Sequence, residues 1–426
     1  MSAQLIAGGL FVCVYALIVT DRIHRTLAAL LGASLMIILR VVDQSEAFTY
    51  VDFNVIFLLA GMMIIANITA KTGIFQWIAV EAVRRARGSP YALLVLTSIV
   101  TAVVSAFLDN VTTVVLLTPV IFFIAQRLGT SPVPFLISQV IASNIGGTAT
   151  LIGDPPNIII GSRLGKDFTD FLMNVGPAAA AALAVYLLLA RWLFRADLRQ
   201  ASAALEAEDI QRLVEEERRI EDSHLMRVSG IVIAFTILGF LLSRAFGLQG
   251  ATIAMTGAVV LMIVAREDVH EILKTVEWPT LFFFVGLFIV VGGVVKTGII
   301  GQLALGVLAF SGGRTDVAAL AVLWMSGLIS AIVDNIPYTV TMVPLIQQLG
   351  HSVDVEPLIW ALSLGANLGG NATVVGASAN VVVASMSEAR GHPISFVTYL
   401  RYGVPATLAT MIVGTIDIWL RYLLFT

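Results

Sequence analysis

The stretch "SAFLDNVTTVVLLTP", residues 105–119, places Asp109 and Asn110 in the middle of a strongly apolar run. A second stretch, "SAIVDNIPYTVTMVP" at 330–344, repeats the Asp-Asn pair 225 residues later. An ionisable side chain is costly in hydrocarbon, so an acid within a membrane segment usually has a function. The recurrence of one unusual pattern therefore indicates a duplicated site.

The composition around these stretches is that of an integral membrane protein. The 426 residues are 58% hydrophobic and 12% charged, whereas soluble domains carry about 25% charged residues. Apolar runs of about 20 residues, the length of helix that crosses the hydrocarbon core, recur from end to end, and the alternation typical of a membrane β-barrel does not occur. The formal charge of -3 lies in short loops and forms no basic face. We therefore predict an all-α polytopic membrane protein with no nucleic-acid partner.

Hydropathy and helix breakers together predict two series of five spans, each with a re-entrant hairpin. We expect a first repeat at 1–194, a charged cytoplasmic linker at 195–227 and a second repeat at 228–426. The hairpins are expected at 91–128 and 318–349. The spans, interrupted ones included, are expected at 5–20, 26–42, 53–70, 132–163, 177–194, 228–243, 251–265, 278–296, 356–388 and 402–424.

Residue identities also indicate an internal repeat. At an offset of 225, "FLLAGMMIIANITAKTGI" (57–74) aligns with "FFFVGLFIVVGGVVKTGI" (282–299), and at an offset of 223 "NIGGTATLIGDPPN" (144–157) aligns with "NLGGNATVVGASAN" (367–380). An odd number of crossings turns the second copy over, which is the inverted topology of many secondary transporters. With both termini outside, 18 of the 25 Lys and Arg residues are cytoplasmic, as the positive-inside tendency requires.

The interrupted segments predict a polar site at the membrane midplane. A broken helix within the bilayer is tolerated only where it is buried in protein or lines a wet cavity, and its free N–H and C=O groups suit a bound solute. Glycines allow close approach of the backbone, and hydroxyls and amides supply hydrogen-bond partners. The candidate residues in the interrupted spans are Asn144, Gly146, Gly147, Thr148, Thr150, Asn367, Gly369, Gly370, Asn371 and Thr373.

The hairpin aspartates, Asp109 and Asp334, are candidate proton carriers. Capping of the returning half-helix is the structural alternative, but the neighbouring asparagines would cap without the cost of a charge. Burial favours a protonated acid, so a carboxylate that faces each side in turn could carry a proton. Asp154, followed by Pro155, has the sequence of a helix cap, and a coupling role is its alternative. Its repeat counterpart is Ala377, so the repeat does not require a charge at this position.

Motifs of enzymes and of metal sites do not occur in the sequence. The five histidines fall in predicted loops, and there is no HExxH, GxSxG or P-loop. This pattern argues against an intramembrane enzyme and against ATP hydrolysis by this chain. The single cysteine, Cys13, lies in the first span and is interpreted as a packing residue. We therefore expect no cofactor and no metal site.

The motifs "FLDNVTTVVLLTPV" and "NIGGTATLIGDPPNIII" resemble the ion transporter superfamily, in its branch of arsenite permeases, NhaD-type sodium/proton antiporters and the P protein. The resemblance covers nearly the whole chain. It implies two inverted repeats, a homodimer, and a transport domain that moves against a scaffold. It also implies a substrate site at the hairpin tips and unwound helices. The tips add six candidate residues to those in the interrupted spans, namely Asp109, Asn110, Thr112, Thr113, Asp334 and Asn335.

The leading hypothesis is efflux of arsenite or antimonite across a bacterial cytoplasmic membrane, driven by inward proton flow through Asp109 and Asp334. The alternative is a Na⁺/H⁺ antiporter that uses the same aspartates. An organic anion carrier ranks lower, because two carboxylates would repel a di- or tricarboxylate. A channel and a non-transporting scaffold are the remaining alternatives. Some arsenite pumps dock a soluble ATPase subunit, and the sequence leaves this partner open.

Overall fold

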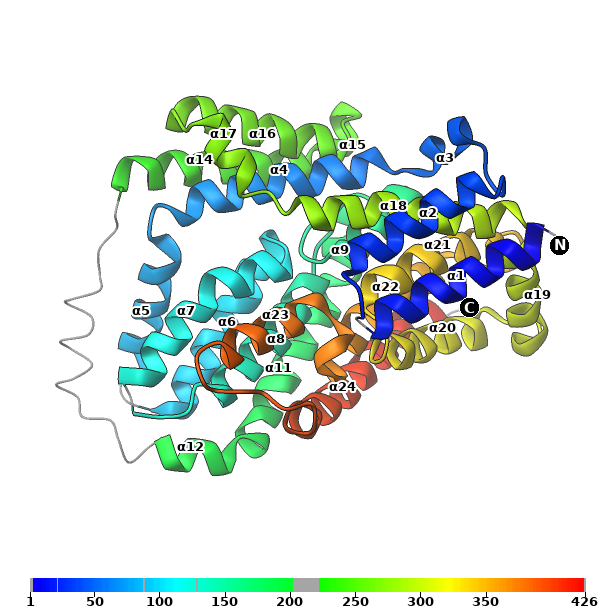
Figure 1. Cartoon of the computed structure of the whole chain (residues 1–426). Coiled ribbons are helices and arrows are strands. Elements are labelled where there is room, and N and C mark those ends of the chain that lie inside the picture. Colours follow the sequence, from blue (N-terminus) through cyan, green and yellow to red (C-terminus); the bar gives the residue numbers. More distant parts are fainter. Residues whose placement is uncertain (1–2, 21, 87–88, 128, 202–221, 425–426) are drawn as a thin grey trace.

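The computed structural model describes residues 3–20, 22–86, 89–127, 129–201 and 222–424 (Figure 1). These residues form helices and no strand, which confirms the predicted all-α class. The helices up to residue 201 are α1 (Ala3–Thr20), α2 (Arg25–Ile38), α3 (Gln44–Tyr50), α4 (Phe53–Ala70), α5 (Ile74–Ala86), α6 (Pro90–Phe107), α7 (Asn110–Arg127), α8 (Val133–Thr148), α9 (Pro155–Leu164), α10 (Phe168–Asn174), α11 (Gly176–Leu193) and α12 (Arg195–Ala201).

A similar series follows after residue 222. Its helices are α14 (Ser223–Leu241), α15 (Ser243–Phe246), α16 (Gly250–Ala265), α17 (Val269–Lys274), α18 (Trp278–Lys296), α19 (Ile299–Ser311), α20 (Thr315–Ser330), α21 (Asn335–Leu349), α22 (Glu356–Gly369), η1 (Gly370–Ala372), η2 (Val374–Gly376), α23 (Ser378–Glu388), α24 (Phe396–Ile418) and η3 (Trp419–Leu423). Of the predicted linker at 195–227, residues 202–221 lie outside the described residues.

Seven of the described helices are long and apolar enough to cross a membrane. The pair α19 and α20 also passes this test together but is bent by 118° at its break. Large apolar side chains are widely exposed on these helices, as Phe235 and Leu188 are at 69% and 70%. Helices that face lipid present such surfaces, whereas soluble monomers expose few of them in contiguous patches. The structure thus agrees with the membrane assignment.

Several described helices were not predicted, and the two longest of them, α5 and α19, each lead into a hairpin. In α5 the charged residues Glu81, Arg84 and Arg85 lower the hydropathy, and both arginines pair with the glutamate within the helix. The helix α19 is apolar but has only 13 residues before Gly312 and Gly313, both at positive φ, end it. Span length, the criterion used on the sequence, therefore failed for both helices.

Within the predicted segments, α6 with α7 and α20 with α21 each form a hairpin. In the first, Ser98 of α6 bonds to Ser138 of α8 and Thr118 of α7 bonds to Gln139 of α8, so both legs run back along the same part of α8. In the second, the hydroxyls of Ser326 and Tyr338, on opposite sides of the break, lie 3.0 Å apart. We call α6–α7 hairpin 1 and α20–α21 hairpin 2, with their tips at residues 108–110 and 331–335.

The two halves pack against each other through pairs of equivalent contacts, in which a helix of each half packs on a helix of the other. Helix α4 packs on α16 while α18 packs on α2, and α9 packs on α21 while α23 packs on α7. A Cβ on Gly61 would lie 2.7 Å from the backbone of Ala254, and a Cβ on Gly286 would lie 2.6 Å from that of Ala29. Only glycine permits these two crossings. The opposite orientation of the halves in a membrane, and the domain boundaries, stay predictions.

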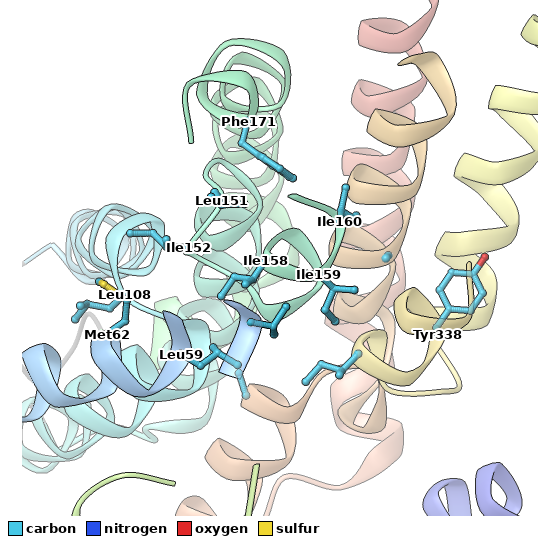
Figure 2. Packing of buried hydrophobic residues seen from close by; sticks show 14 of the residues in the cluster. Leu59, Met62, Leu108, Leu151, Ile152, Ile158, Ile159, Ile160, Phe171 and Tyr338 are labelled. Carbon is cyan, nitrogen blue, oxygen red and sulfur yellow. The ribbon is translucent and has the colours of Figure 1, made fainter. Parts of the chain in front are cut away.

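The helices form two assemblies (Figure 1). The scaffold consists of α1–α4 and α14–α18, which pack mainly on one another. The central bundle consists of α6–α9, α11 and α20–α24, and α5 and α19 connect the two assemblies. Figure 2 shows apolar side chains of α4 (Leu59, Met62), of hairpin 1 (Leu108) and of α9 (Ile158) gathered in one buried cluster at their boundary.

Candidate functional site

The tip of hairpin 1 presents its asparagine, not its aspartate, to the centre of the bundle. The amide nitrogen of Asn110 donates to Asn144 Oδ1 at 3.1 Å and to Asp154 Oδ2 at 2.9 Å. Asp109 Oδ1 accepts the backbone N–H of Thr112 at 2.9 Å, which caps α7. Thr113 is buried close behind the tip, and its hydroxyl has no partner among the described residues.

Hairpin 2 repeats this geometry with one addition. Asn335 Nδ2 donates to Asp154 Oδ1 at 3.3 Å, and Asp334 Oδ1 accepts the N–H of Ile336 at 3.0 Å. The other carboxylate oxygen of Asp334 accepts Ser378 Oγ at 2.6 Å and lies 3.3 Å from Nη1 of Arg25. Arg25 lies between the predicted spans 5–20 and 26–42 and was not among the predicted site residues.

Asp154 lies between the two tips and is fully buried. It has the extended backbone of an N-cap residue, with φ -145 and ψ 135, but its side chain makes no cap hydrogen bond. Each of its oxygens instead accepts from one hairpin asparagine. Within the described part of the chain, no cationic side chain forms an ion pair with Asp154. Asp154 therefore occupies the predicted N-cap position before Pro155, but its side chain does not cap α9 and is instead the meeting point of both tips.

The break between α8 and α9 is stabilised by an asparagine that was not among the predicted site residues. Asn157 Nδ2 donates to the carbonyls of Thr148 at 3.0 Å, Thr150 at 2.8 Å and Gly147 at 3.4 Å. In the second half, Asn380 Nδ2 donates to the carbonyls of Gly370 and Thr373, each at 2.8 Å. These amides satisfy backbone acceptors that a broken helix leaves free.

A chain of buried amides joins the two breaks. Asn144 Nδ2 donates to Asn371 Oδ1 at 3.0 Å and to Asn380 Oδ1 at 2.9 Å, and Asn367 Nδ2 donates to Asn157 Oδ1 at 2.8 Å. Two atoms of this network, Asn371 Nδ2 and Asn367 Oδ1, lack a partner among the described residues. The sequence pattern contained the signal for Asn157 and Asn380, because both end the aligned motifs at 144–157 and 367–380.

The remaining predicted residues lie in the same region. The hydroxyl of Thr150 donates to the carbonyl of Ala106, and that of Thr373 donates to the equivalent carbonyl of Ala331 at 2.6 Å. Thr148 donates to the carbonyl of Asn144 at 2.7 Å. The predicted residues that also lie buried along the breaks or the tip are Gly146, Gly147, Gly369, Gly370 and Thr112.

Two hairpins whose tips meet a buried acid between two broken helices, in an all-helical chain with membrane-length apolar helices, define a polytopic membrane transporter. Comparison with known proteins gives the family. A family model described as "Citrate transporter" (CitMHS) matches residues 15–365. The chain therefore belongs to the CitMHS family, and it is a transporter and not an enzyme.

The relatives agree with this assignment. The chain is 40% identical to a 46 kDa membrane protein of Mycobacterium leprae over 99% of this chain and 100% of that protein. It is 40% identical to an uncharacterized transporter of Mycobacterium tuberculosis over 98% and 99%, respectively. It is 35% identical to the human P protein over 96% of this chain and 59% of that protein. The predicted resemblance to the ion transporter superfamily is thereby confirmed.

A solved structure supports the fold. The YdaH transporter of Alcanivorax borkumensis, described as having an unusual topology, matches with a TM-score of 0.58. The match covers 85% of this chain and 84% of that one, at 16% sequence identity. At this identity the likeness concerns the fold alone.

Proposed function

We propose that this transporter couples the movement of a small cargo to protons, and that Asp154 carries the proton. The observation that supports this is the position of Asp154, which is fully buried and bonded to both hairpin tips. The two hairpin acids fit the role less well. Asp334 is already paired with Arg25, and Asp109 caps α7. The proposal thus moves the coupling role from the hairpin acids to Asp154.

A buried carboxylate without a cationic partner is stable when it is protonated or when a cation is bound to it. Proton and cation therefore exclude each other at Asp154. A carrier built in this way binds one as it releases the other, which is the basis of exchange. The hydrogen bonds from Asn110 and Asn335 hold the carboxylate in place in either state.

The surrounding atoms favour a cation as cargo. The side-chain nitrogens of Asn110 and Asn335 are used by Asp154, and within the described residues their Oδ1 atoms accept no hydrogen bond. Amide and carboxylate oxygens are the ligands that hard cations prefer, and sodium-coupled carriers bind their ion beside broken helices. We therefore propose Na⁺/H⁺ exchange as the activity that the geometry supports best.

An organic anion fits this site less well, although the family carries the name of citrate. Asp109, Asp154 and Asp334 lie at or between the tips and would repel a tricarboxylate. Among the described residues, Arg25 is the cation that contacts a tip, and its guanidinium is held by Asp334. A citrate ion would need this guanidinium and find it occupied.

Arsenite or antimonite efflux is the second candidate, because the free oxygens of Asn110 and Asn335 also suit a neutral trihydroxide. Its O–H groups would donate to these amides and to Asp154, with no change of charge at the site. Proton inflow through the same carboxylate would then drive efflux. The two candidates share the binding residues and differ in the charge of the cargo.

Alternating access in this proposal is a displacement of the central bundle against the scaffold. The boundary between them carries ion pairs at its edges, such as Arg163 with Asp52 at 3.0 Å. The proposed location is a bacterial cytoplasmic membrane with both termini outside, as the distribution of basic residues suggests. A homodimer and a soluble ATPase partner stay proposals that rest on the family resemblance.

The test uses the purified full chain in proteoliposomes with an internal pH dye. A Na⁺ gradient should move protons in the wild type, in a saturable manner, and Asp154→Asn should reduce this exchange to the level of empty vesicles. Asp316→Asn is the matched control, because Asp316 pairs with Arg314 at the exposed start of α20 and the loss of this pair should not change the exchange.

A second arm measures arsenite accumulation in everted vesicles with and without a pH gradient. If arsenite accumulates in a manner that depends on Asp154 and no Na⁺/H⁺ exchange is seen, the cargo is the metalloid and not the cation. Exchange that survives in Asp154→Asn would refute the coupling role of Asp154. Non-saturating, uncoupled flux would indicate a channel, and no flux of any kind would indicate a non-transporting protein.

A further inference from the structure

Arg25 joins the scaffold to the tip of hairpin 2. It is the first residue of α2 in the scaffold, and its Nη1 lies 3.3 Å from Asp334 Oδ2 and 2.5 Å from Ser378 Oγ. Its guanidinium also stacks over the ring of Phe283 in α18, 5.5 Å from the ring centre. A scaffold cation, clamped on a scaffold ring, thus holds a carboxylate of the central bundle.

A second scaffold residue contacts hairpin 2 near the same place. The hydroxyl of Tyr15 in α1 donates to the carbonyl of Pro337 and lies 2.5 Å from Thr341 Oγ1. Both partners are in α21, the returning leg of the hairpin. Two polar scaffold side chains therefore dock hairpin 2, one at its tip and one on its returning leg.

Among the described residues, no scaffold side chain docks hairpin 1 in an equivalent way. At the repeat offset of 225, the counterpart of Arg25 is Gly250 and that of Tyr15 is Phe240. Neither residue has a side-chain hydrogen-bonding group. Asp109, the counterpart of Asp334, forms no ion pair within the described residues. The asymmetry lies in the sequence itself and is not a detail of side-chain placement.

The ion pair matters because a moving bundle must break it. Arginine stays charged under all physiological conditions, and a charge-assisted pair that is stacked on an aromatic ring is among the stronger polar contacts. Separation leaves the carboxylate of Asp334 without a countercharge in a largely buried setting. A cation that reaches the tip supplies that countercharge and so lowers the cost of separation.

We propose that Arg25 is a tethered counter-ion that docks hairpin 2 on the scaffold while no cargo cation is bound. A cation at the tip competes with the guanidinium and releases the bundle. Arg25 in this role is a positioning residue, since it acts on the cargo site through Asp334. The inference rests on the proposed cation transport for the identity of the competitor, but the docking itself is tested without any cargo.

The experiment measures distances between scaffold and bundle by pulsed electron paramagnetic resonance. Spin labels are attached in a Cys13→Ser background at Val269→Cys in α17 and Phe396→Cys in α24, two positions that are each 51% exposed. The full chain is reconstituted in lipid nanodiscs with choline as the salt cation. We expect one dominant distance, and in Arg25→Gln about a tenfold higher ratio of undocked to docked molecules. Arg314→Gln, which removes the exposed ion pair with Asp316 at the start of α20, is the matched control and should leave the distribution unchanged.

Two further arms keep the result decisive. The charge exchange Arg25→Asp with Asp334→Arg should return the distribution toward that of the wild type, and Arg25→Lys should shift it less than Arg25→Gln. Na⁺ should shift the wild type in the same direction as Arg25→Gln and add little to that variant. Size-exclusion profiles identify any variant that fails to fold.

An unchanged distribution in folded Arg25→Gln, or no restoration in the charge exchange, would overturn the docking role. A Na⁺ shift as large in Arg25→Gln as in the wild type would overturn the competition. Absence of Na⁺/H⁺ exchange in the wild type would refute the proposed function instead, and the comparison in choline would still decide the docking.

Discussion

Hairpins 1 and 2 carry the same Asp-Asn pair, and in each the aspartate caps the returning helix while the asparagine donates to Asp154. Their surroundings differ. The acid of hairpin 2 is neutralised by Arg25 of the scaffold, whereas the acid of hairpin 1 has no ion pair within the described residues. A duplicated motif thus gives two tips with one shared contact and two different electrostatic environments.

The breaks that face these tips should show the largest effects on stability. The side chain of Asn157 donates hydrogen bonds to three backbone carbonyls and accepts hydrogen bonds from Ser363 and Asn367. The side chain of Asn380 donates to two backbone carbonyls. Asn157→Ala leaves more buried groups unsatisfied, so we expect it to cost about 3 kcal/mol of unfolding free energy and Asn380→Ala about 2. Thermal unfolding in detergent, followed by tryptophan fluorescence, measures both.

The control for this pair is Asn67→Ala, because the amide of Asn67 is exposed and donates to a single carbonyl at 3.1 Å. It should change stability by no more than about 0.5 kcal/mol. Equal losses of stability in all three variants would mean that the side-chain amides of Asn157 and Asn380 do not stabilise the breaks.

Substitutions at the two helix crossings between the halves should destabilise the protein equally. Equal losses would support the equivalent packing of α4 on α16 and of α18 on α2. Gly61→Ala and Gly286→Ala each place a Cβ within 2.7 Å of a backbone atom of the facing helix. Overpacking of this kind costs about 1–3 kcal/mol, and we expect the two costs to match. The same unfolding assay applies. Gly9→Ala is the control, since nothing lies within 4 Å of its Cβ position, and a marked loss there would point to a general effect of the substitution.

Substitution of the two hairpin acids should change stability by smaller and unequal amounts. Asparagine caps a helix nearly as well as aspartate, so Asp109→Asn should be close to neutral for stability. Asp334→Asn leaves Arg25 without its anion, and the partial exposure of that arginine limits the extra cost to about 1 kcal/mol. A double-mutant cycle with Arg25→Gln isolates the pair. Identical stabilities of the two Asp→Asn variants would remove the difference between the tips.

The smallest effect concerns an ion pair between the halves at the edge of the scaffold. Lys296 donates to Glu46 at 2.5 Å, and this hydrogen bond holds the pKa of Glu46 below its usual value. A lowered pKa contributes stability above the unfolded-state value, and this contribution is lost as pH falls through the folded-state value. Glu46→Gln should therefore lower the unfolding temperature slightly at pH 7 and not at pH 3. A difference that grows on acidification would contradict this sign.

Much of the fold could be predicted from the sequence. The Asp-Asn repeat located both hairpins, and the aligned glycine motifs located both breaks, because broken helices need these residue types at fixed places. Helices α5 and α19 were not predicted, because α5 carries charged residues and α19 is short. The site was predicted as a region, but the contacts of its three acids could not be predicted, because burial and cation contacts depend on distant segments.

By itself the sequence determined that this chain crosses the membrane as helices, that its halves are related, and that acids and amides interrupt its apolar segments. These properties follow from hydropathy and from residue spacing along one chain, which are local. The tertiary structure alone decided that Arg25 lies against Asp334, 309 residues away, and that Asp154 faces both tips. Such contacts depend on how helices pack in space, and electrostatic partners are chosen by that packing.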